Sequence, residues 1–452
     1  MTALYAALGV LFFVFAILAS IGLHEVGHMV PAKKFGAKVP QYFIGFGPTV
    51  WSKQVGETEY GLKAFPLGGF VKIVGMLPPA PAGAPDATPD QVDSEGEPLV
   101  AVRKSNTGMF TQLISDARAA EWEFVQGTDA DRLFYRLPWW KKVIVMAGGP
   151  MVNVAIAFFL FWGIFATVGN YNDRGVDPVV TEVLDCVVPY ARQDQACQPG
   201  DPETPAKQAG LQVGDRFVSI NGTEVTSWEQ LQGLIRGNAD GAVTIVVDRD
   251  GEPVTLHTNT TVTARPTSQT DETLEQVGFL GVVPKDLGPT HGGPLYTAQW
   301  MGSATVDVAK ALGTLPVKVW HVGLAAVGVE KRDNAGPVSV VGGARIAGEV
   351  AASDKLDATD TLVTLLTVVA GFNLFIGLFN FIPLLPLDGG HIAGALYEAV
   401  RRGIARLRHR PDPGYVDVAK LLPVAYVVGA ALLVMGLVLI VGDIVAPVDV
   451  GL

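Results

Sequence analysis

The sequence predicts a polytopic α-helical membrane protein with four transmembrane helices and an inserted α+β domain. Three observations point to this fold class. The chain of 452 residues is 49% hydrophobic and only 17% charged, which is more apolar than an ordinary soluble enzyme. Four separate segments are long and apolar enough to cross a bilayer. An acidic segment rich in turns lies between the second and the third of them. The net charge of −11 argues against nucleic acid as a partner.

The first predicted span, residues 3–29, ends in a group of ionisable side chains. Residues 1–23 contain no charge, and His24, Glu25 and His28 follow directly. The H-E-x-x-H spacing places two imidazoles one helical turn apart on one face, which suits two ligands of a Zn²⁺ ion. Glu25 is then placed beside the metal, where it can take a proton from water. Ionisable groups at membrane depth are costly and usually functional, so the motif predicts proteolysis within the membrane. The alternative is an amphipathic helix end whose polar residues face water or headgroups.

The amino terminus resembles a signal peptide in its apolar run. It lacks a positively charged beginning and an evident cleavage site, so we expect it to be retained as the first span.

The other predicted spans cover residues 142–168, 362–385 and 421–442. Lysines follow the first span and precede the second, and five arginines lie at 401–410, between the third and the fourth. Residues 170–290 instead hold 18 Asp and Glu against 8 Lys and Arg. Because positive charge favours the cytoplasmic side, the loops at 30–141 and 388–420 are expected in the cytoplasm. The 169–360 region and both termini are expected outside, with the active site near the cytoplasmic side.

A catalytic zinc needs one more protein ligand than the two histidines supply. Asp388 is the best candidate, because it ends the third apolar segment beside Gly389 and Gly390, after prolines that break a helix. A broken helix that carries a carboxylate at that depth is expected to line a site. His391 is a rival ligand, although its place three residues later favours the cytoplasmic interface or a supporting role.

The segment between the first two spans has three parts. Residues 59–75 predict two short strands about Pro66 and the Gly68–Gly69 pair, that is, a β-hairpin; the alternative is an ordinary soluble hairpin at the membrane surface. Residues 77–99 are rich in Pro, Ala, Asp and Glu and read as a disordered linker. Residues 105–137 include a candidate amphipathic helix, and 134–142 predict an interfacial anchor before the second span.

The external segment predicts a compact α+β domain. Glycines mark turns at 210 and 214, a strand is expected at 217–220, and Asn221–Gly222 is its turn. A helix at 227–236, a strand at 244–249 and a turn at Asp250–Gly251 follow. The run 206–222 closely resembles the bacterial type of PDZ signature, and PDZ domains capture extended peptides by strand addition.

Two further features belong to the external region. Cys186 and Cys197 lie where a disulfide can persist, with two free thiols as the alternative. Residues 306–327 predict an amphipathic helix on the outer surface, in which His321 is an interfacial side chain rather than a ligand.

Together these motifs resemble the site-2 protease family of intramembrane zinc metalloproteases, in particular the bacterial regulator-of-sigma-E-protease type. The matching elements are H-E-V-G-H at 24–28, A-G-G-P-M-V-N at 147–153, the PDZ-like segment, and N-F-I-P-L-L-P-L-D-G-G at 380–390. The resemblance implies an enzyme of the bacterial inner (plasma) membrane. It implies zinc held by His24, His28 and Asp388, with Glu25 as the catalytic carboxylate.

The same resemblance implies how substrate is bound and which substrates are cleaved. The hairpin would be membrane re-entrant, with Gly68 and Gly69 beside the metal, and would pair with an unwound substrate whose freed amides need partners. Asn380 would lie near the substrate backbone, and Asn153 would help the packing. The implied substrates are single-span membrane proteins such as anti-sigma factors, trimmed outside by an upstream site-1 protease; relatives also act on remnant signal peptides. One PDZ domain is expected here, while some relatives carry two.

Two other classes of function stay open from the residues alone. In a transporter or channel, His24, Glu25 and Asp388 would form a proton or metal pathway; a catalytically silent scaffold would act through its PDZ domain. A soluble zinc protease is disfavoured because four spans would lack a purpose.

The expected domain organisation follows from the predicted spans and motifs. It consists of a first transmembrane helix at 1–32, the re-entrant hairpin region at 33–76, a cytoplasmic loop and linker at 77–140, the second transmembrane helix at 141–169, the extracytoplasmic PDZ domain at 170–290, an extracytoplasmic amphipathic region at 291–360, the third transmembrane helix with the Asp ligand at 361–390, a cytoplasmic basic loop at 391–420 and the fourth transmembrane helix at 421–443.

Overall fold

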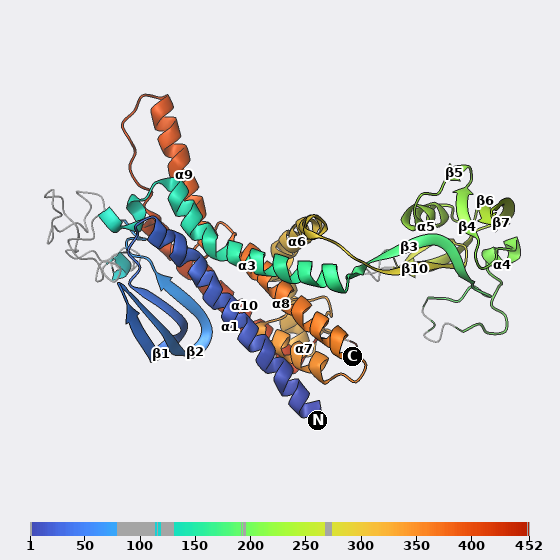
Figure 1. Ribbon diagram of the computed structural model, residues 1–452, viewed down its shortest axis with the longest axis horizontal. Helices are drawn as coiled ribbons and strands as arrows, with labels where there is room; N and C mark the ends of the chain where they lie inside the picture. Colours follow the sequence, from blue (N-terminus) through green and yellow to red (C-terminus); the bar gives the residue numbers. More distant parts are fainter. Residues whose placement is uncertain are drawn as a thin grey trace. The chain divides into compact units, whose positions relative to one another are not determined.

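The computed structural model describes residues 2–78, 114, 116–118, 131–190, 192, 196–266, 274–449 and 451. The chain divides into two compact units. Unit 1 comprises Met1–Ile164 and Gly293–Leu452, and unit 2 comprises Phe165–Gly292. Unit 1 carries the long helices, and unit 2 carries strands β3 to β10 (Figure 1). The linker expected at 77–99 and the helix expected within 105–137 lie for the most part outside the described residues.

Among the described residues, four helices are long and apolar enough to cross a membrane. They are α1 (Thr2–Lys34), α3 (Trp139–Thr167), α8 (Ala358–Asn380) and the stretch Val418–Val445, which joins η3 (Val418–Leu421) to α10 (Leu422–Val445). Large apolar side chains are exposed along these helices, as expected for surfaces that meet lipid. The four predicted spans are therefore confirmed as helices.

The third apolar segment ends earlier than its sequence indicated. The apolar run continues to residue 385, but α8 ends at Asn380, and the prolines that follow prevent its continuation. Asp388 does not belong to this helix: it is the first residue of α9 (Asp388–Leu407). The basic segment at 391–420, expected as a loop, is therefore helical over most of its length.

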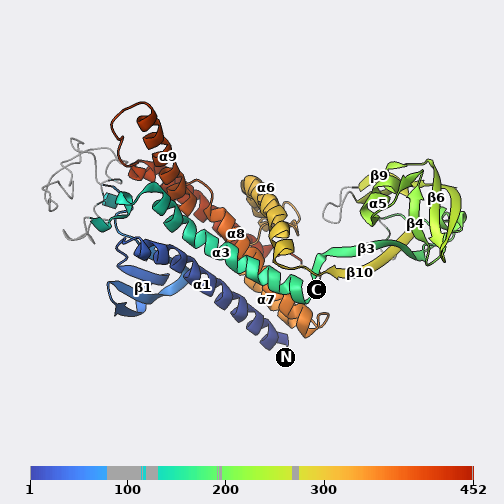
Figure 2. The same ribbon diagram turned by 45° about the horizontal axis from the view of Figure 1, so that its top comes forward.

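Glycines let the helices of unit 1 approach closely. A Cβ added to Gly27 of α1 would lie 2.4 Å from the Gly148 carbonyl oxygen of α3, so the two backbones touch here. At the other end of α1, a Cβ on Gly9 would lie 2.3 Å from the Ala347 oxygen of α7 (Val340–Ala352), a helix that the sequence did not predict. Figure 2 shows α1, α3 and α8 running alongside one another. The helix expected at 306–327 is the longer α6 (Pro294–Ala326).

A two-stranded sheet flanks α1 in unit 1. It consists of β1 (Gln41–Val55) and β2 (Thr58–Lys72), both interrupted by shifts in register. Because of these shifts, residues 41–44 pair with 59–62 on one side and with 69–72 on the other. Both strands expected within 59–75 thus belong to β2, and their shared partner, β1, was missed. Gly45 and Gly47, both at positive φ, interrupt the alternating pattern that would have indicated it.

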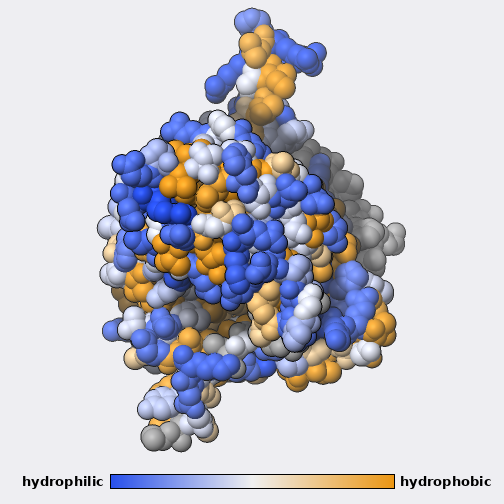
Figure 3. Space-filling view, turned by 90° about the vertical axis from the view of Figure 1, so that its right-hand side faces the viewer, coloured by the Kyte–Doolittle hydropathy of each residue, from blue (hydrophilic) through white to orange (hydrophobic). Residues whose placement is uncertain are grey.

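Unit 2 is an α+β domain built on antiparallel strands. Its larger sheet has the order β10-β3-β4-β6-β7, with β5 paired to β4, and β8 and β9 form a separate pair. The helices α4 and α5 pack with these sheets around a core that includes Phe217, Leu231 and Ile245. In Figure 3, where unit 2 faces the viewer, hydrophilic residues surround smaller hydrophobic areas. The bounds are β3 (Asn170–Val183), α4 (Pro205–Ala209), β4 (Arg216–Ile220), β5 (Thr223–Glu224), α5 (Trp228–Gly237), β6 (Ala242–Arg249), β7 (Glu252–Asn259), β8 (Thr261–Pro266), β9 (Leu274–Phe279) and β10 (Val282–Thr290).

The secondary structure predicted for unit 2 is confirmed. The strand at 217–220 lies in β4, the helix at 227–236 in α5 and the strand at 244–249 in β6. Ser227 caps α5 by accepting a hydrogen bond from the Gln230 amide, 3.2 Å away. Asn221–Gly222 and Asp250–Gly251 have positive φ at both residues, as a tight hairpin turn requires. Cys186 and Cys197 form a disulfide.

Candidate active site

The H-E-x-x-H motif lies near the C-terminal end of α1. This helix is continuous through the motif, so His24 and His28 project from the same face one turn apart. Both histidines are buried, whereas Glu25 between them is only partly buried. Pro31 lies inside the same helix but beyond the motif.

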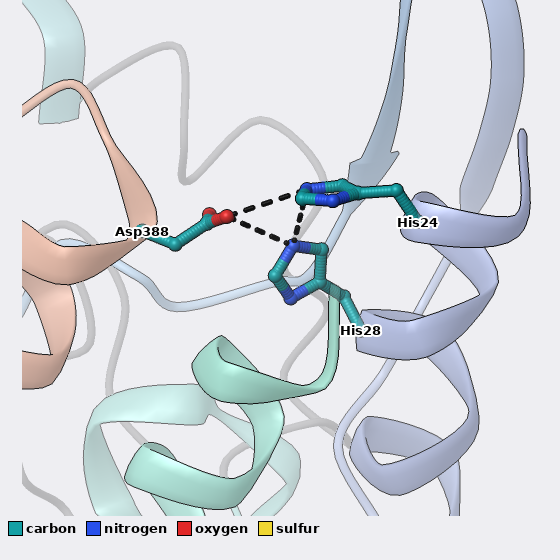
Figure 4. A group of neighbouring side chains, drawn as sticks. All are labelled: His24, His28 and Asp388. Carbon is teal, nitrogen blue, oxygen red and sulfur yellow. Dashed lines mark hydrogen bonds and ion pairs between the residues drawn. The ribbon is translucent and has the colours of Figure 1, made fainter. Parts of the chain in front are cut away.

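Asp388 meets the two histidines although it is more than 350 positions away in the chain. Its Oδ2 lies 3.3 Å from the Nε2 atom of His24 and 3.3 Å from that of His28. The two Nε2 atoms are 3.2 Å apart. Figure 4 shows the two rings reaching from α1 toward the carboxylate, which lies at the beginning of α9. One ligand atom from each residue lies within 4.8 Å of the others, as a shared metal ion would require.

Hydrogen bonds on the far side of each imidazole fix its orientation. The Nδ1 atom of His24 lies 3.0 Å from Oδ1 of Asn153, and that of His28 lies 2.8 Å from the Val145 carbonyl oxygen. Both acceptors belong to α3, which packs against α1. Because each acceptor takes a proton from Nδ1, the neutral rings direct the lone pairs of their Nε2 atoms toward Asp388.

This donor set fits zinc. Two imidazole nitrogens and one carboxylate oxygen are ligands of catalytic zinc sites that keep a further position open. Two nitrogen lone pairs and a carboxylate oxygen that face one another at 3.2–3.3 Å repel unless a cation lies between them. Gly149 of α3 keeps the space free, since a Cβ there would lie 2.3 Å from Nε2 of His28 and 2.7 Å from Nε2 of His24.

Glu25 faces the end of β2. A Cβ on Gly69 would lie 3.1 Å from the Cγ atom of Glu25 and 3.2 Å from Cγ2 of Ile21. Glycine at position 69 therefore lets the strand come close to the carboxylate. The residues of α1, β2, α3, α8 and α9 enclose a cavity of about 350 Å³, which is lined by Ile21, His24, Glu25, His28, Gly68, Gly69, Phe70, Val71, Ile73, Met76, Met146, Asn153, Ile376, Asn380 and Asp388.

The structure brings the predicted site residues together around one cavity. The two histidines, Glu25 and Asp388 form its polar centre, and Asn380, Gly68 and Gly69 line its walls. His391, the rival ligand, does not belong to the metal-binding group, and it borders a different, smaller cavity. His321 pairs with Glu330, their atoms 2.8 Å apart, and likewise is not part of the group.

Sequence reasoning assigned no role to Gly149 or to the Val145 carbonyl, and it gave Asn153 only a packing role. The A-G-G-P-M-V-N motif contained two of these residues, so a signal was present for Gly149 and Asn153. A carbonyl acceptor leaves no signal in a sequence.

Two buried histidines and an aspartate that together fit a zinc ion, with a carboxylate beside them and apolar helices around them, are the arrangement expected of a zinc metalloprotease set in the membrane. The sequence model of peptidase family M50 matches residues 12–422, and the chain belongs to this family of site-2 proteases. It is a multi-pass membrane protein that cleaves membrane substrates in regulated intramembrane proteolysis. The transporter and scaffold alternatives are thereby excluded as its main function.

Similar proteins cover nearly the whole chain. The zinc metalloprotease Rip1 of Mycobacterium tuberculosis is 34% identical over 450 residues, which are 97% of this chain and 98% of that protein. Rip1 of Mycolicibacterium smegmatis is 32% identical over 453 residues, 98% of each chain. The regulator of sigma-W protease RasP of Bacillus subtilis is 25% identical over 413 residues, 84% of this chain and 87% of that protein.

Proposed function

We propose that His24, His28 and Asp388 hold the zinc ion and that Glu25 is the general base and acid of peptide-bond hydrolysis. The observation that carries this assignment is the meeting of the three ligand atoms, with Glu25 in the same cavity. Zinc bound there supplies a Lewis acid that polarises the scissile carbonyl and makes water more acidic. Glu25 takes a proton from the attacking water and delivers it to the leaving nitrogen. Asn153 and the Val145 carbonyl hold the two imidazoles in the tautomer that binds metal.

Substrate binding is proposed along the end of β2. Residues 69–72 pair with 41–44 on one side and, among the described residues, with no second strand on the other. An unwound substrate segment can pair with this free edge, because its own amides need partners at membrane depth. Gly68 and Gly69 leave room for the substrate backbone beside Glu25, and the Asn380 amide side chain supplies a polar group on another wall of the cavity.

We further propose that unit 2 is a PDZ domain outside the cytoplasm. Its acidic composition, disulfide and largely hydrophilic surface support an extracytoplasmic place (Figure 3). The lysines and arginines flanking the spans support the matching orientation, in which the loops at 30–141 and 388–420 face the cytoplasm of a bacterial inner (plasma) membrane. The domain boundaries predicted from the sequence are retained in this proposal, except that Asp388 lies in α9 rather than in the third span.

The proposed substrates are single-span membrane proteins, such as anti-sigma factors, after an upstream site-1 protease has removed their external part. The relative RasP, whose name describes a regulator of sigma-W, supports this class. The PDZ domain is proposed to exclude untrimmed substrates by its bulk.

Zinc content and cleavage measured on the same purified samples test the assignment. Wild-type enzyme and Glu25→Gln are each incubated in detergent micelles with a model single-span substrate. We expect Glu25→Gln to keep zinc and its melting temperature but to lose at least about a hundredfold in rate, the usual size of a lost general acid–base. Unchanged cleavage by Glu25→Gln would refute the role given to Glu25. Loss of zinc in His24→Ala without loss of folding tests the ligand assignment separately.

A further inference from the structure

A buried ion pair joins α3 to α9. The Nζ atom of Lys142 in α3 lies 2.7 Å from Oε2 of Glu398 in α9. The two residues are 6% and 2% exposed, so the contact is shut off from water. Neither residue lines the cavity that holds the proposed metal site, and the proposed chemistry gives neither a role. Two charges hidden in this way need a reason, because taking them out of water can cost as much free energy as their attraction contributes.

Lys142 lies on the same face of α3 as the residues that support the two histidines. Val145, Gly149 and Asn153 follow it at i+3, i+7 and i+11, which is the spacing of one helix face. The Val145 carbonyl and the Asn153 side chain bind the two Nδ1 atoms, and Gly149 leaves room for the rings. One face of α3 therefore orients both imidazoles and also carries the ammonium group of Lys142.

Asp388 and Glu398 likewise share one face of α9. Positions 391, 395 and 398 follow Asp388 at i+3, i+7 and i+10, and His391, Ala395 and Glu398 border the same small cavity. Ten residues along a helix span about 15 Å, so the rigid first half of α9 connects the two carboxylates. Figures 1 and 2 show α9 beside the start of α3. A contact that holds Glu398 against α3 therefore also determines where Asp388 lies.

The surroundings of Glu398 make the bond from Lys142 its directional contact. Arg402 Nη2 lies 3.3 Å from Oε1 of Glu398, but this oxygen accepts no hydrogen bond among the described residues. The Tyr415 ring covers both cations, with its centre 5.1 Å from Lys142 Nζ and 5.2 Å from the guanidinium carbon of Arg402. Arg402 and the ring thus add charge and cover, while Lys142 fixes the direction of the carboxylate.

We propose that the Lys142–Glu398 pair is a positioning contact, which keeps α9 in the register against α3 that brings Asp388 to the two histidines. The inference rests on the proposed function, because it takes Asp388 as a zinc ligand. α3 orients two of the ligands and α9 supplies the third, so a shift between the helices would separate them. A hydrogen-bonded ion pair specifies such a register more narrowly than apolar contacts do. The pair acts through Asp388 and takes no part in the chemistry.

Zinc affinity, measured by chelator competition on the full-length protein in micelles, tests this proposal. We expect Glu398→Gln to lower the affinity about 10–100-fold, the usual effect of a group that orients a metal ligand. Lys142→Arg keeps the charge and the donor and should retain most of the affinity. Asp443→Leu is the matched control, since it breaks another buried ion pair of unit 1, between side chains that are 5% and 2% exposed. It should lower the melting temperature and leave zinc affinity as in wild type.

The same measurement in an Asp388→Ala background separates positioning from a general loosening of unit 1. Asp388→Ala should itself weaken zinc binding, and Glu398→Gln should then have no further effect, because no ligand is left for it to position. Loosening would lower the affinity in both backgrounds and would overturn the proposal. Wild-type affinity in Glu398→Gln would overturn the positioning role alone. Wild-type affinity in Asp388→Ala would overturn the ligand assignment as well.

A double variant keeps the test decisive if Glu398→Gln folds poorly. Lys142→Met together with Glu398→Met removes both buried charges, so we expect a melting temperature close to that of wild type. Its zinc affinity should stay below that of wild type, because the apolar contact does not specify the register. Recovery of zinc affinity together with the melting temperature would show that the pair serves folding only. A loss of zinc affinity in Asp443→Leu as large as that in Glu398→Gln would overturn the proposal in the same way.

Discussion

Single residues of α3 control the geometry of the proposed zinc ligands His24 and His28. Asn153 and the Val145 carbonyl accept from the two Nδ1 atoms, and Gly149 leaves the space that the Nε2 atoms fill. Groups that orient metal-bound histidines are typically worth 10–100-fold in metal affinity or activity. α3 is therefore expected to influence the metal affinity of a site whose proposed ligands come from α1 and α9.

Asn153→Ala is expected to lower zinc affinity about 10–100-fold, because His24 loses the acceptor that fixes its ring. Zinc retained after dialysis against graded chelator measures the change. Asn153→Asp keeps an oxygen acceptor at the same place and should retain most of the zinc. Equal zinc retention by Asn153→Ala and wild type would show that the hydrogen bond does not tune the site.

Gly149→Ala is expected to prevent zinc binding in a folded protein. The new Cβ would lie 2.3 Å and 2.7 Å from the two Nε2 atoms, so the imidazoles must leave their positions. Zinc analysis together with thermal melting checks this result. Gly163→Ala is the matched control, since among the described residues a Cβ at that position of the same helix would meet no atom within 4 Å. A zinc content of Gly149→Ala equal to that of the control would contradict the proposed centre.

The proposed catalytic residues were more predictable than the groups that support them. The spacing of His24, Glu25 and His28 on an uncharged span carries its chemistry in the sequence, and Asp388 follows from a helix break beside glycines. The role of the Val145 carbonyl depends on which face of α3 meets α1. That contact is set by a close approach of Gly27 and Gly148, and no local pattern reveals it.

At the scale of whole elements, long apolar helices were predictable and the strands of unit 1 were only partly so. Membrane-spanning helices are recognised from the length and hydropathy of a segment, and both can be read directly from the sequence. β1 was missed because its glycines at 45 and 47 interrupt alternation and because its exposed apolar residues do not follow one face. α7 was missed since its glycine-rich sequence has little intrinsic helix preference and relies on packing against α1.

Asp443 connects α10 to the segment before α7, and we expect this contact to contribute to stability. Asp443 is 3% exposed; it accepts from Arg332 at 2.9 Å and from the Ser339 amide at 2.6 Å. Asp443→Leu leaves the Arg332 charge buried and unpaired, so we expect a loss of about 3–5 kcal/mol in stability, seen as a lower Tm in micelles. The double variant Asp443→Leu with Arg332→Met removes both charges and should recover much of the loss. Asp307→Asn, which breaks an exposed pair with Lys310, should have little effect. A Tm for Asp443→Leu equal to that of Asp307→Asn would disprove this role.

The stability of unit 2 should depend on pH through the ionisation of Asp215. Burial alone would raise the pKa of this carboxyl, but hydrogen bonds from Arg249 at 2.7 and 2.8 Å and from the Gln212 amide lower it overall. A lowered pKa in the folded state contributes stability above the unfolded value of about 3.9, and that stability is lost as the pH falls through the folded value. Hydrogen exchange of β4 and β6 amides, measured between about pH 5 and pH 3, should therefore show less protection at the acid end. Asp215→Asn should be less protected at pH 5 and should change less on acidification; an acid response as large as that of wild type would exclude Asp215 as its source.

At the scale of the whole molecule, every residue of the proposed catalytic site belongs to unit 1. The ligands and Glu25 come from α1 and α9, and their supports come from α3, all outside Phe165–Gly292. The ends of unit 2 also lie next to each other, because the Gly292 amide donates to the Phe165 oxygen at 3.1 Å. Unit 2 is thus an insertion whose removal leaves a short gap, as is usual where a domain is inserted into another.

Deleting residues 175–285 should therefore leave an active protease that no longer rejects untrimmed substrates. Register pairs at the base of the β3–β10 ladder, such as Arg174 with Pro289, stay in the chain and can be joined by a short glycine–serine link. We expect zinc content close to that of wild type and cleavage of both full-length and trimmed single-span substrates, whereas wild type cleaves only the trimmed form. Quantifying both cleavage products over time, with Glu25→Gln in the deletion background as the blank, checks this result. A deletion variant that binds zinc and cleaves trimmed substrate yet still spares the full-length form would show that selection resides in unit 1.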